Sequence, residues 1–192
     1  MSIKTMSRRK LLRSIPAAAA GVAVAGCTVS TLNGVTTISV KNAVVENYTD
    51  VGIEVLKAAL GFTGVPAAIV TVVDTGISVV QAALAAYIKT AGTTTVLTFN
   101  STSVPAALTS LISDLSTVAS DISAAAAAEK SNLSADLTTK ITQVASDVAT
   151  AGSVIESMIS AITSAPLSAG AVPAEERRQF VIDGIKARYG IN

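Results

Sequence analysis

Two series of aliphatic residues, spaced alternately by three and four positions, occupy the second half of this 192-residue chain. The first series runs from Leu108 to Ala125, and the second runs from Leu137 to Ile162. Such spacing places one apolar stripe along a helix and is typical of helices that pack in coiled coils or bundles. All six aromatic residues lie outside positions 100–179, so a core built there consists mainly of small aliphatic side chains. We therefore predict a mainly α fold with heptad-patterned helices.

The register of the two series shifts near residues 129–132. That shift allows either an antiparallel hairpin or one long helix with a phase slip. We favour a helical hairpin over residues 100–163, because folding back buries both stripes within one chain. Residues 104–163 are also the candidate segment for binding a protein partner or for self-association. Charged residues border both stripes, as charges border a coiled-coil seam: Asp114, Asp121, Lys140 and Asp147.

Residues 35–99 carry a different pattern. Runs of β-branched residues at 35–40 and 93–99 predict two short strands. Helical segments are predicted between them, at about 42–60 and 66–90. A strand–helix–helix–strand order returns the second strand antiparallel to the first, which predicts a small two-stranded β ribbon.

The C-terminal part divides into a linker and a helix. Residues 164–173 contain two prolines and are predicted to be a linker. An amphipathic helix is predicted within residues 174–192. Acidic residues at its start and basic residues at its end complement the helix dipole.

The N-terminal 27 residues have the layout of an export signal, a basic segment followed by the small apolar segment Ile15–Gly26. Within it, Ser7-Arg8-Arg9-Lys10-Leu11-Leu12-Arg13 resembles the bacterial twin-arginine (Tat) signal, with Leu and Arg where Phe and Lys are usual. The resemblance implies that Arg8 and Arg9 are the recognised pair. The general secretory (Sec) route stays open, because no basic residue lies beside the cleavage site.

The signal ends in Val24-Ala25-Gly26-Cys27, which resembles a lipoprotein lipobox. The resemblance implies that Cys27, the single cysteine, is acylated and becomes the mature N-terminus. Several acyl chains on one residue are enough for stable membrane attachment. Cleavage after Ala25, which would release a soluble protein, is the alternative. Residues 28–34 are then predicted to form a polar tether.

Charge and composition argue against several classes of function. Five of the 14 basic residues lie in the first 13 positions, so the rest of the chain has nine basic and 13 acidic residues. That balance does not favour nucleic-acid binding. The chain lacks His, the commonest general base and a common metal ligand. Ser131 beside Lys130 is a weak catalytic pair in a predicted surface turn. We expect no enzyme activity, no cofactor and no metal.

Residues 66–88 form an apolar stretch that is long enough to span a membrane and is interrupted by Asp74 and Gln81. A charged residue at mid-bilayer costs about 2.5–3.5 kcal/mol, which favours a core helix instead. The sequence as a whole predicts an exported, lipid-anchored helical protein of the cell envelope or periplasm, with a structural or protein-interaction role. Two alternatives stay open: a membrane-active protein that inserts residues 51–89, and a carrier of an apolar ligand.

Overall fold

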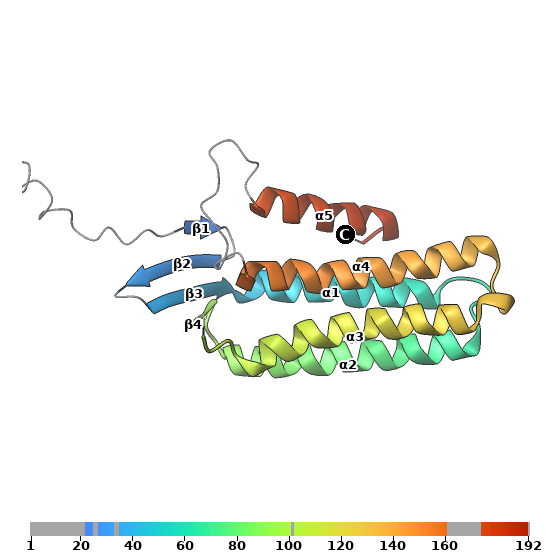
Figure 1. Cartoon of the computed structure of the whole chain (residues 1–192), viewed down its shortest axis with the longest axis horizontal. Coiled ribbons are helices and arrows are strands. Elements are labelled where there is room, and N and C mark those ends of the chain that lie inside the picture. The colour runs from blue at the N-terminus through green and yellow to red at the C-terminus, as the bar shows by residue number, and fades with distance from the viewer. Residues whose placement is uncertain (1–21, 25–26, 33–34, 101, 161–173, 192) are drawn as a thin grey trace, which may run out of the picture.

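The computed structural model describes residues 22–24, 27–32, 35–100, 102–160 and 174–191. These residues form a four-helix bundle with a small sheet at one end and a fifth helix along one side (Figure 1). The predicted mainly α fold is confirmed. The predicted linker at 164–173 lies outside the described residues.

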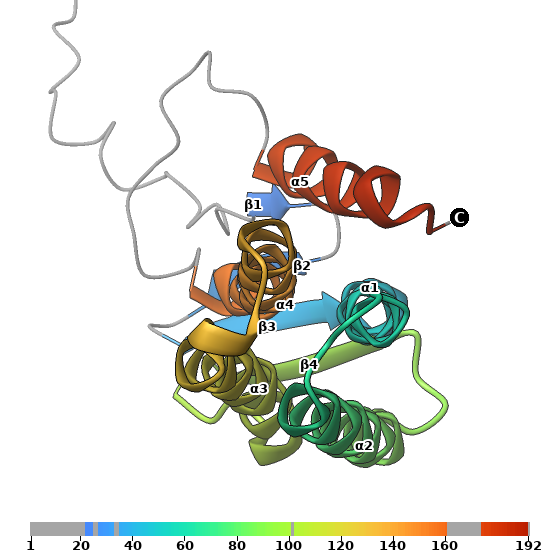
Figure 2. The same cartoon turned by 90° about the vertical axis from the view of Figure 1, so that its right-hand side faces the viewer.

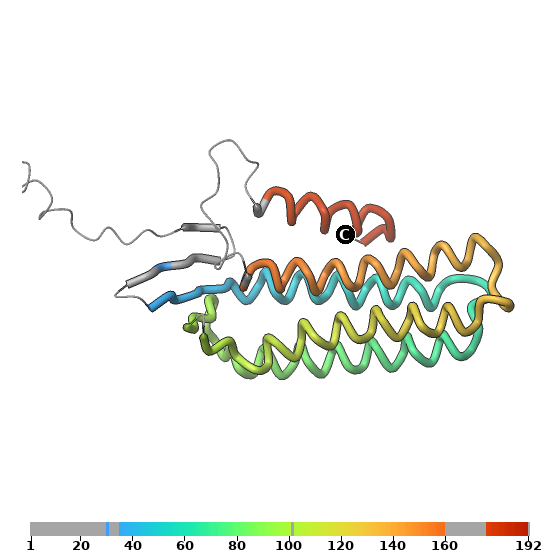
Figure 3. The backbone as a smooth tube through the Cα atoms, viewed as in Figure 1, coloured from blue at the N-terminus to red at the C-terminus, as the bar shows by residue number. Residues whose placement is uncertain are grey.

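The bundle helices follow the chain in an up-down-up-down order, and each contacts its two neighbours in a closed square (Figure 2). The tube in Figure 3 shows that consecutive helices run antiparallel. The fifth helix packs outside the square, against α1 and α4. The bounds are α1 Asn42–Leu60, α2 Ala67–Ala91, α3 Ala106–Ala128, α4 Ala135–Ser160 and α5 Ala174–Tyr189.

The helices α3 and α4 form the predicted hairpin, with a short 3-10 turn, η2, over Lys130–Asn132 between them. Ser134 caps the second helix, since its Oγ accepts a hydrogen bond from the backbone N–H of Leu137 at 3.2 Å. The shift of heptad register therefore marks a reversal of the chain. The alternative of one continuous helix is wrong.

The heptad residues form the interior of the bundle. In the first series every member but the half-buried Ala125 is buried, and in the second every member up to Met158 is buried. Helices α1 and α4 approach α3 closely at two glycines. An ideal Cβ at Gly52 of α1 would lie 3.1 Å from Leu115 Cδ2, and one at Gly152 of α4 would lie 3.2 Å from Leu115 Cβ. Leu115 thus fills space that two glycines leave open.

The sheet has four antiparallel strands in the order β1-β2-β3-β4. Strands β3 and β4 are the predicted ribbon, with Lys41 opposite Val96 and Thr37 opposite Asn100. Observed β4 begins three residues later than predicted and ends one residue later. The bounds are β1 Val22–Val24, β2 Cys27–Leu32, β3 Val35–Lys41 and β4 Val96–Asn100.

Strand β2 corrects the tether predicted over residues 28–34, because residues 28–32 pair with β3. Leu32 pairs with Val35, so the two strands are joined by Asn33 and Gly34 alone. Asn-Gly between two β-branched runs is a strong sequence signal for a tight hairpin. The polar character of the segment reflects Thr and Ser in a strand, not a linker.

A buried polar network joins the sheet to the bundle. Asn42, the first residue of α1, donates from Nδ2 to the Thr94 carbonyl at 2.7 Å and from its backbone N–H to the Thr95 carbonyl at 3.1 Å. The Tyr87 hydroxyl of α2 donates to Asn42 Oδ1 at 2.7 Å. One side chain therefore fixes the start of α1 relative to the segment before β4 and to the end of α2.

Candidate interaction surfaces

The residues predicted to direct export lie at the edge of the described structure or beyond it. Arg8 and Arg9 lie outside the described residues. Cys27 is the first residue of β2, and its backbone pairs with Val24 of β1 and Val40 of β3. Removal of a leader ending at Gly26 would separate β1 from β2 and leave all five helices intact.

The two apolar stripes within residues 104–163 face the interior of the bundle. Their apolar members pack in the bundle core, so a partner of this segment would contact the outer faces of α3 and α4. The charged residues that border the stripes differ in exposure and in pairing. Asp121 is exposed, and exposed Lys140 pairs with Asp136 one turn earlier, with Nζ 2.8 Å from Oδ2. Asp147, by contrast, is buried.

Asp147 connects α4 to α5. Its carboxylate, with 6% of the side chain exposed, forms an ion pair with the Arg188 guanidinium. It also accepts hydrogen bonds from the Tyr189 hydroxyl at 3.0 Å and from Gln143 Nε2 at 3.0 Å. A buried carboxylate is costly unless it is paired and hydrogen-bonded, and these three donors satisfy it. Asp147, which was predicted to border a coiled-coil seam, instead binds residues of the C-terminal helix α5.

The same carboxylate affects the groups that it binds. Burial, and then the charge of Asp147, raises the pKa of the Tyr189 hydroxyl above its ordinary value of 10.0. The hydrogen bond to Asp147 raises the pKa of Arg188. Both groups therefore remain protonated donors at neutral pH. A raised tyrosine pKa contributes stability that is complete below pH 10 and is lost as the pH rises further.

Replacing Asp147 by Asn is expected to loosen α5 by about 1–2 kcal/mol, because Arg188 loses its ion-pair partner and the amide satisfies fewer donors. Hydrogen exchange of the α5 backbone amides measures the loss. The matched control is Asp183→Asn, since that exposed carboxylate accepts a hydrogen bond from Gln179 within α5. Equal exchange rates in the two variants would contradict the role of Asp147.

The helix predicted at the C-terminus is present, but its apolar residues divide between two faces. Ile182 and Ile185 are buried, whereas Phe180 is 80% exposed and Val181 is also exposed. The run Phe180-Val181-Ile182 is the reason, since three consecutive residues cover more than half of a helix circumference. Arg178 also lies on the inner face and is 9% exposed.

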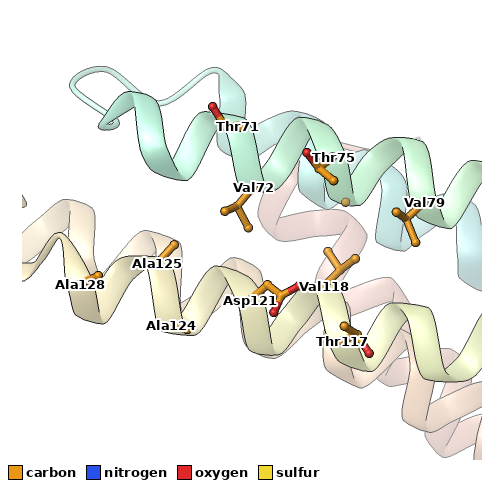
Figure 4. A pocket seen from close by; sticks show the side chains of 11 residues that line it. Thr71, Val72, Thr75, Val79, Thr117, Val118, Asp121, Ala124, Ala125 and Ala128 are labelled. Atoms are coloured by element: carbon orange, nitrogen blue, oxygen red, sulfur yellow. The ribbon is translucent and has the colours of Figure 1, made fainter.

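A groove of about 480 Å³ follows the seam between α2 and α3 (Figure 4). Its lining is mostly apolar and open to solvent, and Asp121 is the carboxylate among the lining residues. The figure shows Val72 and Val79 of α2 above Val118 of α3. The remaining lining residues are Thr71, Thr75, Gly76, Thr117, Ala124, Ala125 and Ala128.

Helix α2 is long and apolar enough to cross a membrane by length and composition, as its sequence predicted. Its inner stripe packs in the bundle, yet only 28% of its most apolar window is buried. Helices of the core of a soluble protein pass the same test but are mostly buried. α2 is therefore a bundle helix whose most apolar window is largely exposed.

The catalytic pair suggested by the sequence lies on the surface of the molecule. Ser131 and Lys130 are both exposed in η2, the surface turn expected for them. No group of three or more Cys, Asp or Glu side chains lies close enough to hold a metal ion within the described ranges. Comparison with protein-family models, with curated proteins and with solved structures finds no match to this chain. The surfaces themselves are the basis for a functional proposal.

Proposed function

We propose that this chain is an exported, lipid-anchored helical protein of the bacterial cell envelope, with a structural or protein-binding role. The observation that carries the proposal is the twin-arginine-like leader that runs directly into a lipobox containing the single cysteine, Cys27. A lone thiol immediately after a leader is explained by acylation, since several acyl chains on one residue attach a protein stably to a membrane.

The arrangement of the folded part is compatible with this processing. All helices begin at or after Asn42, so cleavage before Cys27 removes no part of the bundle. A bundle that folds without the leader suits the twin-arginine route, which generally carries folded proteins. The net negative charge of the chain after the leader is consistent with protein contacts rather than with nucleic-acid binding.

A protein-binding role is supported by the apolar outer surface. The α2–α3 groove and the exposed Phe180 offer apolar side chains to solvent on two different sides of the molecule. Exposed apolar patches of this kind mark interaction sites in soluble domains. The dispersed carboxylates and the absence of His in the sequence favour binding over catalysis.

The anchor is tested by intact mass and cell fractionation of the full chain expressed in a bacterium with a Tat pathway. We expect a mature protein that begins at Cys27, carries acyl mass and lies in the membrane fraction. Cys27→Ser should shift nearly all of it out of that fraction, whereas the control Ser30→Ala in the same strand should not. A product that begins at Gly26 without lipid would defeat the proposal.

The export route is tested by replacing Arg8 and Arg9 together with Lys. Loss of export with accumulation of the precursor supports the twin-arginine route, whereas unchanged export assigns the chain to the Sec route. In both cases the position of the mature N-terminus reports on the lipobox separately.

The membrane-active alternative also predicts association with membranes, but through α2. Insertion of that helix would carry Asp74 into the bilayer, at a cost of up to about 3.5 kcal/mol for a carboxylate near its centre. It would also remove the buried α2 side chains from the bundle core. Leakage of dye from liposomes with the Cys27→Ser protein separates this alternative from anchoring.

A further inference from the structure

The outer face of α2 has a regular pattern of its own. Its exposed residues recur with alternating spacings of four and three, on the side of the helix opposite the buried stripe. The spacing is that of the α3 and α4 heptads, although these positions carry small and polar residues instead of aliphatic ones. The positions are Thr71, Thr75, Ser78, Ala82, Ala85 and Lys89.

The α2–α3 groove continues this face on one side. Val79 lies at the edge of the face and also lines the groove, where it is 39% exposed. On the other side of the face, Ile88 is 43% exposed. Val79 and Ile88 are nine residues apart, about 180° around α2, so a helix laid along the face would cover only the near edge of each. Covering those edges would remove some apolar surface from water, which favours association.

The charges on this face identify the partner. Asp74 lies toward one end of α2 and Lys89 toward the other, and both are exposed. They are 15 residues apart, which is about 22 Å along a helix and about 60° in rotation, so they share one face. In the part of the chain that the structure describes, neither side chain forms an ion pair.

We infer that the outer face of α2 binds the same face of a second copy of this chain, with the two α2 helices antiparallel. In that arrangement the pairing is centred between Gln81 and Ala82. Asp74 of each copy then lies beside Lys89 of the other, so the two-fold symmetry gives two identical ion pairs. The small side chains near the axis, Ser78, Ala82 and Ala85, allow the helices to approach closely.

A parallel pair of α2 helices would not form these ion pairs, because it would place Asp74 against Asp74 and Lys89 against Lys89. A lipid surface would not pair both charges either, since it offers no ordered pair of opposite charges at this spacing. The inference goes beyond the proposed anchoring and does not depend on acylation. Both copies on one membrane would, however, raise the effective concentration for pairing.

The test is a charge exchange in the full chain, measured by sedimentation equilibrium in a density-matched detergent. We expect the wild type to be a dimer. Asp74→Lys and Lys89→Asp should each raise the dissociation constant by about tenfold or more, because each replaces two attractive contacts by two repulsive ones. The double variant Asp74→Lys/Lys89→Asp should restore the affinity to within about threefold. Added salt should weaken the wild-type dimer.

The matched control is Glu156→Lys, an equal change of charge on an exposed residue of α4, which is diagonal to α2 in the bundle. It should leave the dissociation constant unchanged, and circular dichroism should show native helix content in every variant. A wild type that stays monomeric, or a dimer that neither single reversal weakens, would overturn the inference. So would a monomeric Cys27→Ser protein that permeabilises liposomes, since α2 would then face lipid.

Discussion

Replacing Leu115 by Ala is expected to lower the free energy of unfolding by about 3–5 kcal/mol, the range for a fully buried leucine whose cavity cannot close. Leu115 has no exposed surface, and its side chain lies against the faces of Gly52 and Gly152. Because neither glycine has a side chain that could move into the space, the cavity should persist. Urea denaturation monitored by circular dichroism measures the change.

Two variants at the same place provide the comparison for this prediction. Leu115→Met keeps the volume of the side chain and should cost less than about 1.5 kcal/mol. Ser116→Ala, at the exposed neighbouring position, should change the stability by less than about 0.5 kcal/mol. If Leu115→Ala cost no more than Leu115→Met, the site would not be the packed centre of the bundle.

Replacing Gly76 by Ala is expected to destabilise the protein by about 2 kcal/mol, although alanine is the better helix former. An ideal Cβ at Gly76 would lie 2.5 Å from Val118 Cγ1, so α2 and α3 would have to separate. Val118 cannot turn aside easily, because a β-branched residue in a helix has one strongly preferred rotamer. Thermal or urea unfolding would report the change.

A second substitution distinguishes this clash from other effects of Gly76→Ala. The double variant Gly76→Ala/Val118→Ala should be more stable than the sum of the two single changes predicts, since the smaller Val118 side chain makes room for the methyl group. Gly184→Ala is the matched control in a helix where an added Cβ meets nothing within 4 Å. It should stabilise the protein by about 0.5–1 kcal/mol. A stabilising Gly76→Ala would show that the two helices are further apart.

Much of the fold follows from the sequence because its signals are local. The heptad spacing of Leu108 to Ala125 and of Leu137 to Met158 identifies core residues directly, and the change of register identifies the reversal between α3 and α4. The β-branched runs around Ile38 and Leu97 identify the strands that pair beside the bundle. Periodicity predicts which face of an element is buried, so these features could be inferred without a structure.

Other features depend on the tertiary arrangement or on a weak local signal. Asn33-Gly34 is a hairpin signal, but it indicates the β2–β3 hairpin only if the Thr-rich segment before it is a strand. The burial of Asp147 could not be inferred, because it depends on where α5 docks. The exposure of α2 could not be inferred from the sequence either, because its apolar content fits a core helix and an interface helix equally well.

The hairpin of β2 and β3 limits how far an anchored bundle could stand from its membrane. Fully extended, the chain from Cys27 to Asn42 would reach about 50 Å. The strands instead double back, and Val40 pairs with Cys27, so the chain returns to within about one strand spacing of Cys27 two residues before the first helix begins. A lipid on that sulfur would hold the protein close against the bilayer, where a partner has to approach along the surface.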